Sequence, residues 1–161
     1  MAKEYDLNEV KVQYKKLQER YNLPNFELMN QEFSIEKIAD SETEILTREI
    51  RRYIADKIFN YLRFIETLLN PANAPMFIFS VIKSMSSDDK KKLTDIYVKL
   101  SEIDLELIKL DIESSESKDA EFIGKVYYSW QNIKKELIPI LSKLKNVKDN
   151  EEDKSSSRYF G

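Results

Sequence analysis

Apolar side chains recur at spacings of three and four residues through most of this 161-residue chain, and only two glycines and four prolines interrupt them. Such spacing places side chains along one face of an α-helix. No segment combines alternating apolar and polar residues with the turn residues that join β-strands. The sequence therefore predicts an all-α fold.

The breaks in this spacing predict where the helices begin and end. Proline cannot continue a helix, so Pro24 and Pro71 are expected to separate successive helices. Four main helices are expected at residues 6–22, 42–69, 88–113 and 118–144, and two short helices at 26–33 and 75–85. We expect an irregular helical bundle that forms a single domain over residues 1–145, followed by a flexible, disordered polar tail at 146–161.

The helix expected at 88–113 carries apolar residues on two faces. One stripe consists of Leu93, Ile96, Leu100, Ile103, Leu107 and Leu110, and the other of Val98, Leu105, Ile108 and Ile112. A helix buries two apolar faces only when it contacts neighbours on both sides. We therefore expect this helix at the centre of the bundle.

The composition argues against several kinds of chemistry. The chain contains no Cys and no His, which removes disulfides, thiol nucleophiles and the metal sites that depend on these ligands. Its two glycines, Gly124 and Gly161, cannot form the glycine-rich loops that cradle phosphates. We expect no cofactor and no enzymatic activity. No apolar run is long enough to cross a membrane and no signal peptide is recognisable, so a cytoplasmic location is expected.

Two carboxylates form the only candidate catalytic group. Asp104 and Asp111 lie in the gap between the two apolar stripes of the helix at 88–113, where we expect them to be partly desolvated. They could support a carboxylate-based, metal-dependent enzyme. We prefer a structural ion pair with Arg51 or Lys57, because carboxylate sites in helical bundles normally recruit His or further acids from facing helices.

The segment at 75–85 is the most apolar part of the chain. Four large apolar residues follow one another from Met76 to Phe79, and they cannot all face inward on one side of a helix. The segment is therefore either a core helix with one or two covered or exposed side chains, or a contact site for a partner. The residues expected to bind a protein partner are Phe77, Phe79, Tyr159 and Phe160.

These observations favour a non-catalytic protein–protein interaction module, an adaptor or a subunit of a larger cytoplasmic assembly. The alternative is a nucleic-acid- or ribosome-associated protein that uses the long helix at 42–69. Its contact residues would be Arg48, Arg51, Arg52 and Lys57. Acidic neighbours at helical spacing can neutralise Arg48 and Arg52, whereas Arg51 and Lys57 have none. A formal net charge of −3 argues against this alternative, although it permits a local basic patch.

The stretch Leu23–Phe33, together with the long Arg-bearing helix and Asn70-Pro71 that follow it, resembles a group of small, all-helical, uncharacterised archaeal proteins. The resemblance spans residues 7–145. It implies a helical fold and a cytoplasmic location. The group has no assigned activity, so the resemblance implies no site residues.

Overall fold

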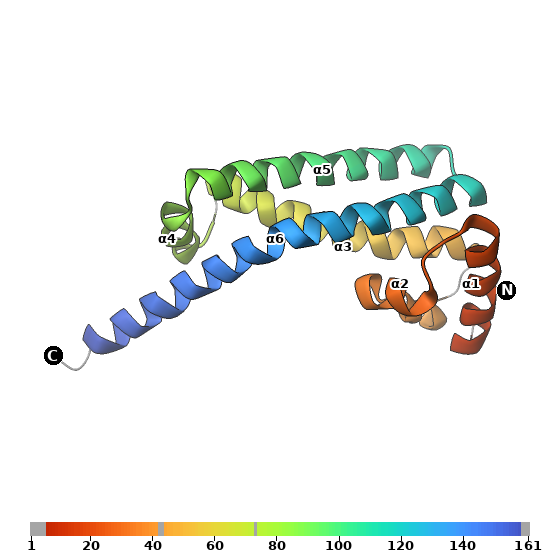
Figure 1. Cartoon of the computed structure of the whole chain (residues 1–161), viewed down its shortest axis with the longest axis horizontal. Coiled ribbons are helices and arrows are strands. Elements are labelled where there is room, and N and C mark those ends of the chain that lie inside the picture. Colours follow the sequence, from red (N-terminus) through yellow and green to blue (C-terminus); the bar gives the residue numbers. More distant parts are fainter. Residues whose placement is uncertain (1–5, 42–43, 73, 159–161) are drawn as a thin grey trace. The chain divides into compact units, whose positions relative to one another are not determined.

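The computed structural model describes residues 6–41, 44–72 and 74–158, and this part of the chain is all-α, as expected (Figure 1). Its elements are α1 (Leu7–Tyr21), α2 (Phe26–Phe33), the 3₁₀-helix η1 (Ile35–Asp40), α3 (Leu46–Leu69), α4 (Met76–Ser84), α5 (Ser87–Ile112) and α6 (Glu116–Arg158). None of these helices is long and apolar enough to span a membrane. The four long helices and two short α-helices correspond to the six segments predicted from the sequence.

Contacts between residues divide the chain into two compact units. Unit 1 comprises Met1–Asn60 and Ser101–Trp130, and unit 2 comprises Tyr61–Leu100 and Gln131–Gly161. The long helices α3, α5 and α6 each contribute one part to unit 1 and another to unit 2. The backbone of α6 continues to Arg158, so no helix end coincides with the domain boundary expected at residue 145.

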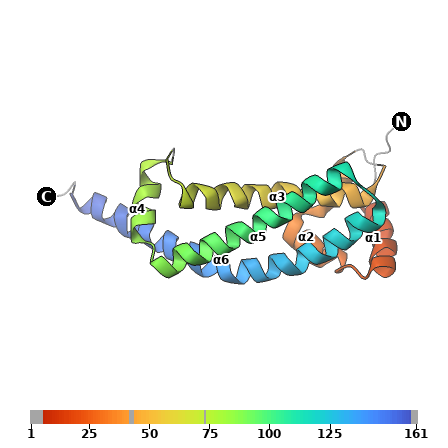
Figure 2. The same cartoon turned by 90° about the horizontal axis from the view of Figure 1, so that it is seen from above.

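Unit 1 is organised around its two N-terminal helices. In both cartoon views, α1 and α2 lie beside the first half of α3 and near the start of α6 (Figure 2). The Tyr14 hydroxyl donates a 2.6 Å hydrogen bond to the carbonyl of Pro24, and its ring packs edge-to-face against Phe26. Burial raises the pKa of this hydroxyl, and nearby Tyr127 raises it further. The tyrosine thus joins α1 to the turn before α2.

Both units have a core of aliphatic side chains on the inner faces of the long helices. Fully buried members in unit 1 include Ile50, Ile54 and Ile58 of α3, and those in unit 2 include Ile65, Leu93, Ile96 and Leu100. Complete burial of one such side chain stabilises a fold by roughly 1.5–3 kcal/mol. The apolar residues whose spacing of three and four predicts the helices are therefore also the residues that form the core.

The structure contradicts the central position expected for α5. The first apolar stripe of this helix is buried, with Leu100 fully inaccessible to solvent. The residues of the second stripe remain exposed: Val98 50%, Leu105 66%, Ile108 52% and Ile112 81%. The prediction was wrong because the spacing of apolar residues identifies a second apolar face without showing whether that face packs against another part of the same chain.

Candidate interaction surfaces

The short helix α4 divides its apolar residues between two sides. Ile78 and Val81 are buried, and the whole of α4 belongs to unit 2. Met76, Phe77 and Phe79 are 86%, 53% and 41% exposed. The structure therefore leaves open three of the four consecutive residues that could not all face inward.

The predicted partner-binding residues lie in two places. Phe77 and Phe79 are on the exposed aromatic face of α4, which we define as Met76, Phe77 and Phe79. Tyr159 and Phe160 lie outside the described residues. Only the first pair can be assigned to a surface.

The four basic residues of α3 do not form one exposed surface. Arg48 and Arg52 are exposed, and Arg52 is paired with Glu49, three residues before it, at 3.1 Å. Arg51 is only 4% exposed. Arg51 is one of the two cations that have no acidic neighbour at helical spacing, and its burial removes it from the exposed surface of α3.

Lys57 is held inside unit 1 by backbone and aromatic groups. Its amine donates to the carbonyl of Glu32 and lies 5.6 Å and 5.3 Å from the ring centroids of Phe33 and Trp130. The indole of Trp130 in turn donates a 2.7 Å hydrogen bond to the carboxylate of Glu32. Cation–π contacts of this kind stabilise a partly desolvated ammonium. The geometry therefore gives Lys57 a role in joining α2, α3 and α6.

The buried guanidinium of Arg51 contacts two acids, the exposed Asp111 and the buried Asp119. Its Nη1 donates to Asp111 at 2.6 Å and to the carbonyl of Leu107 at 3.3 Å, and its Nε lies 3.2 Å from Asp119. The contact with Asp119 has the distance of an ion pair without the alignment of a hydrogen bond. The predicted pairing of Asp111 with Arg51 is confirmed. The predicted desolvation of Asp111 is wrong, because its side chain is 72% exposed.

Asp119 is fully buried and is not among the residues predicted from the sequence. Burial raises the pKa of its carboxyl group, although Arg51 and a 3.1 Å hydrogen bond from Ser114 act in the opposite direction. One sequence signal could have identified it. Asp119 lies three and seven residues before Phe122 and Val126, in line with the buried stripe of α6.

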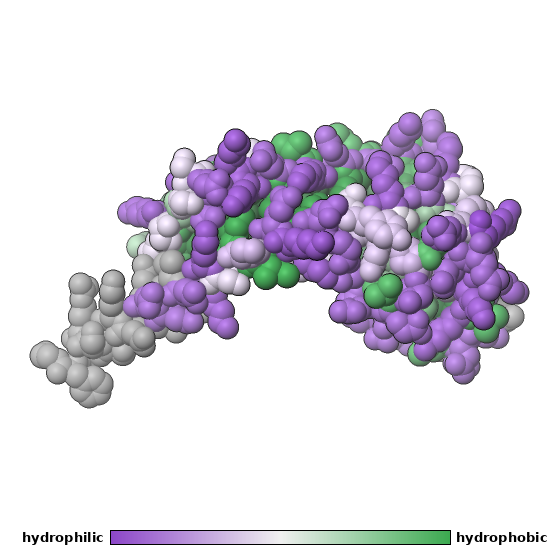
Figure 3. Space-filling model, in the orientation of Figure 1, coloured by the Kyte–Doolittle hydropathy of each residue, from purple (hydrophilic) through white to green (hydrophobic). Residues whose placement is uncertain are grey.

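The outer face of α5 carries a second exposed apolar surface. Leu105, Ile108 and Ile112 follow one another at spacings of three and four residues, and we call them the α5 stripe. Green, apolar atoms are visible over α5 among purple polar side chains (Figure 3). The face opposite this stripe is buried through Ile103, Leu107 and Leu110, so the helix has one covered and one open apolar side.

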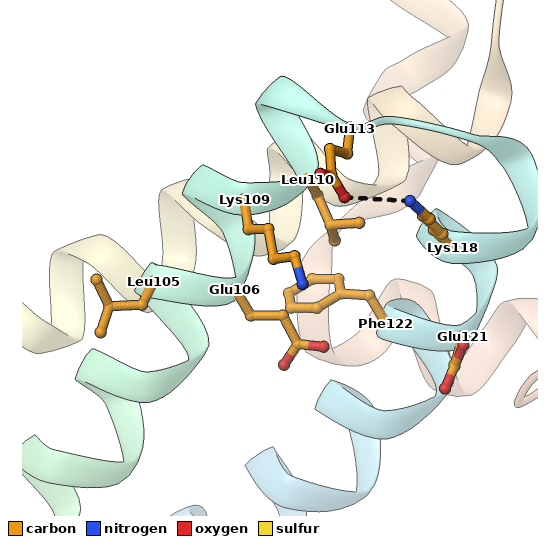
Figure 4. A pocket seen from close by; sticks show the side chains of 8 residues that line it. All are labelled: Leu105, Glu106, Lys109, Leu110, Glu113, Lys118, Glu121 and Phe122. Atoms are coloured by element: carbon orange, nitrogen blue, oxygen red, sulfur yellow. Dashed lines mark hydrogen bonds and ion pairs between the residues drawn. The ribbon is translucent and has the colours of Figure 1, made fainter.

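A shallow groove of about 470 Å³ runs beside the α5 stripe, between α5 and the start of α6. Leu110 and Phe122 lie between the two helices in the close-up, and Lys118 is paired with Glu113 (Figure 4). A second ion pair, between Lys125 and Glu106 at 2.8 Å, also joins α6 to α5. These pairs satisfy most charges of the groove within the chain.

Within the described residues, no three acidic side chains are arranged to hold a metal ion. Asp104 is half-buried, and Asp111, the other member of the proposed pair, forms an ion pair with Arg51. The structure therefore does not bring Asp104 and Asp111 together with a further acid. No family model, curated protein or solved structure matches this chain.

Proposed function

We propose that this chain is a protein–protein interaction module that binds a partner through the exposed aromatic face of α4. The observation that carries the proposal is the division of α4 itself. Its buried residues fix the helix in place, while Met76, Phe77 and Phe79 remain open to solvent. Large apolar side chains gathered on a surface commonly mark a contact site.

The size and chemistry of these residues support this role. Aromatic and Met side chains are enriched at the centres of protein interfaces, where they contribute a large contact area. The helix is anchored, so a partner would not have to order it on binding. We propose that the chain acts as an adaptor or a subunit of a larger cytoplasmic assembly.

The nucleic-acid alternative receives less support. Binding to phosphates depends on several accessible cations on one surface. Arg51 is buried between Asp111 and Asp119, and Arg52 is paired with Glu49. The proposal therefore rests on α4 rather than on the basic residues of α3.

Capture from a nuclease-treated lysate tests the proposal. The wild-type chain should retain a defined protein partner, and Phe77→Asp and Phe79→Asp should each weaken its binding by about 30-fold or more, the loss expected at a central aromatic contact. Val12→Asp is the matched control, because Val12 is 58% exposed on α1 in the other unit. Equal recovery of the partner by all four proteins would contradict the proposed surface.

A further inference from the structure

The α5 stripe is a surface that the proposed function does not use. Its three residues are spaced by three and four positions, seven in total, as are the residues that face the partner in a pair of packed helices. All three are at least half exposed, and the opposite face of α5 is already buried in unit 1. The helix thus offers a narrow apolar seam that is suited to one further helix.

The charges beside this seam limit what can cover it. On a helix, Glu102 and Lys109 lie on the same edge of the stripe, seven residues apart. Neither forms an ion pair within the described part of the chain. The other edge carries Asp104 and Asp111, and the second of these is paired with the buried guanidinium of Arg51.

Two identical helices that pack in antiparallel directions bring the same edge of each helix together. Glu102 of one copy then meets Lys109 of the other, and the symmetry of the pair repeats this contact. The acidic edges also face each other, and the pairing of Asp111 with Arg51 lowers the resulting repulsion. A parallel pair would instead place both Glu102 and Lys109 beside the acidic edge of the other copy, where Glu102 meets like charges and only Lys109 meets an opposite one.

We propose that the α5 stripe binds the same stripe of a second copy of this chain in an antiparallel arrangement. Leu105, Ile108 and Ile112 form the apolar seam, and the reciprocal contacts between Glu102 and Lys109 determine direction and register. Three apolar residues from each copy form a small contact, compared with the ~800 Å² that each partner buries in a standard interface. The dimer is therefore weak, and its population depends on concentration.

Sedimentation across a range of protein concentrations tests for this dimer. The wild-type chain should change from monomer to dimer as its concentration increases. Ile108→Glu should remain monomeric at the concentration where the wild type is half dimeric, because it places a charge in the apolar seam of both copies. Val12→Glu, which also adds an acid at an exposed apolar position, should dimerise as the wild type does. A monomeric wild type up to millimolar concentration, or a dimer that survives Ile108→Glu, overturns the proposal.

Charge reversal tests the direction of the pair. Glu102→Lys and Lys109→Glu should each weaken dimerisation by about threefold to tenfold, because each variant turns two exposed ion pairs into like-charge contacts. The double variant should restore wild-type affinity, since it recreates both pairs with their signs exchanged. No loss in the single variants, or no recovery in the double variant, overturns the antiparallel arrangement.

The dimer and the α4 interface are independent predictions. Phe77→Asp should dimerise normally, and Ile108→Glu should still capture a partner that binds α4. Recovery of a different protein that depends on Ile108, together with a monomeric wild type, would assign the stripe to that protein and overturn the second copy as its occupant.

Discussion

Asp119 in unit 1 and Asp89 in unit 2 occupy similar positions on their helices but have different surroundings. Each lies in the first turn of a long helix, where the helix dipole favours a negative charge. Their exposed fractions are 0% and 5%. Asp119 faces Arg51, which is itself buried, whereas Asp89 accepts hydrogen bonds of 3.0 Å and 3.2 Å from Lys143, whose side chain is 62% exposed.

The pKa values of these two acids move in opposite directions. Burial raises the pKa of Asp119, and the hydrogen bond from Lys143 lowers the pKa of Asp89. Arg51 divides its guanidinium between Asp119, Asp111 and a backbone carbonyl, so it compensates Asp119 only in part. The sign of the pKa shift therefore depends on whether the acid shares its cation with other groups, as well as on the burial of the acid.

The largest effect is expected for Arg51→Met. This variant keeps an unbranched side chain of similar reach but leaves the buried carboxylate of Asp119 without its cation. Removal of one partner from a buried ion pair typically destabilises a protein by about 3–5 kcal/mol. Urea denaturation monitored by circular dichroism should show a decrease of this size in the free energy of unfolding.

Arg48→Met provides the matched control for this measurement. Arg48 lies on the same helix but is exposed, so its replacement should change the free energy of unfolding by no more than about 0.5 kcal/mol. Equal losses in the two variants would show that the buried pair of Arg51 and Asp119 does not stabilise unit 1 in the manner described.

The next effect concerns the pH dependence of Asp119. The pKa of this group is raised in the folded state, so its contribution to stability is complete below its unfolded pKa of about 3.9 and is lost as pH rises through the folded pKa. The free energy of unfolding of the wild type, minus that of Asp119→Asn, should therefore fall from pH 4 to pH 7. A difference that rises over this range would contradict the assigned direction.

Asp89→Asn should give the opposite trend. The pKa of Asp89 is lowered in the folded state, so its contribution is present above its unfolded pKa of about 3.9 and is lost as pH falls through the folded value. The difference in unfolding free energy between the wild type and Asp89→Asn should therefore shrink as the solution is acidified below pH 4. The same direction of change for both acids would remove the contrast between the two units.

The sequence predicts the helices well because the pattern that defines them is local. The spacing of apolar residues and the positions of Pro24 and Pro71 depend only on near neighbours along the chain. The exposure of Phe77 and Phe79 also follows from a local argument, since consecutive residues point in different directions around a helix.

The misplaced features depend on residues that are distant in the sequence. Arg51 contacts an acid 60 positions away, and spacing along one helix carries no information about such a partner. Asp119 resembles an ordinary acid at a helix start, although its alignment with Phe122 makes it part of the core. The second face of α5 shows the same limit, because periodicity identifies an apolar face without showing what covers it.

The smallest effect is expected for Lys143→Met. This variant tests whether the solvent around the Lys143 ammonium limits how much it stabilises Asp89. Lys143 is mostly exposed, so water replaces part of its interaction with Asp89, and the backbone amide of Asp89 is still capped by the Ser86 hydroxyl at 3.0 Å. The loss in unfolding free energy at pH 7 should be well below that of Arg51→Met, while the pH dependence attributed to Asp89 should become weaker. If Lys143→Met destabilised the chain as strongly as Arg51→Met, an exposed ammonium would stabilise its acid as much as a buried guanidinium does. The difference between the two sites would then have to come from the acids themselves.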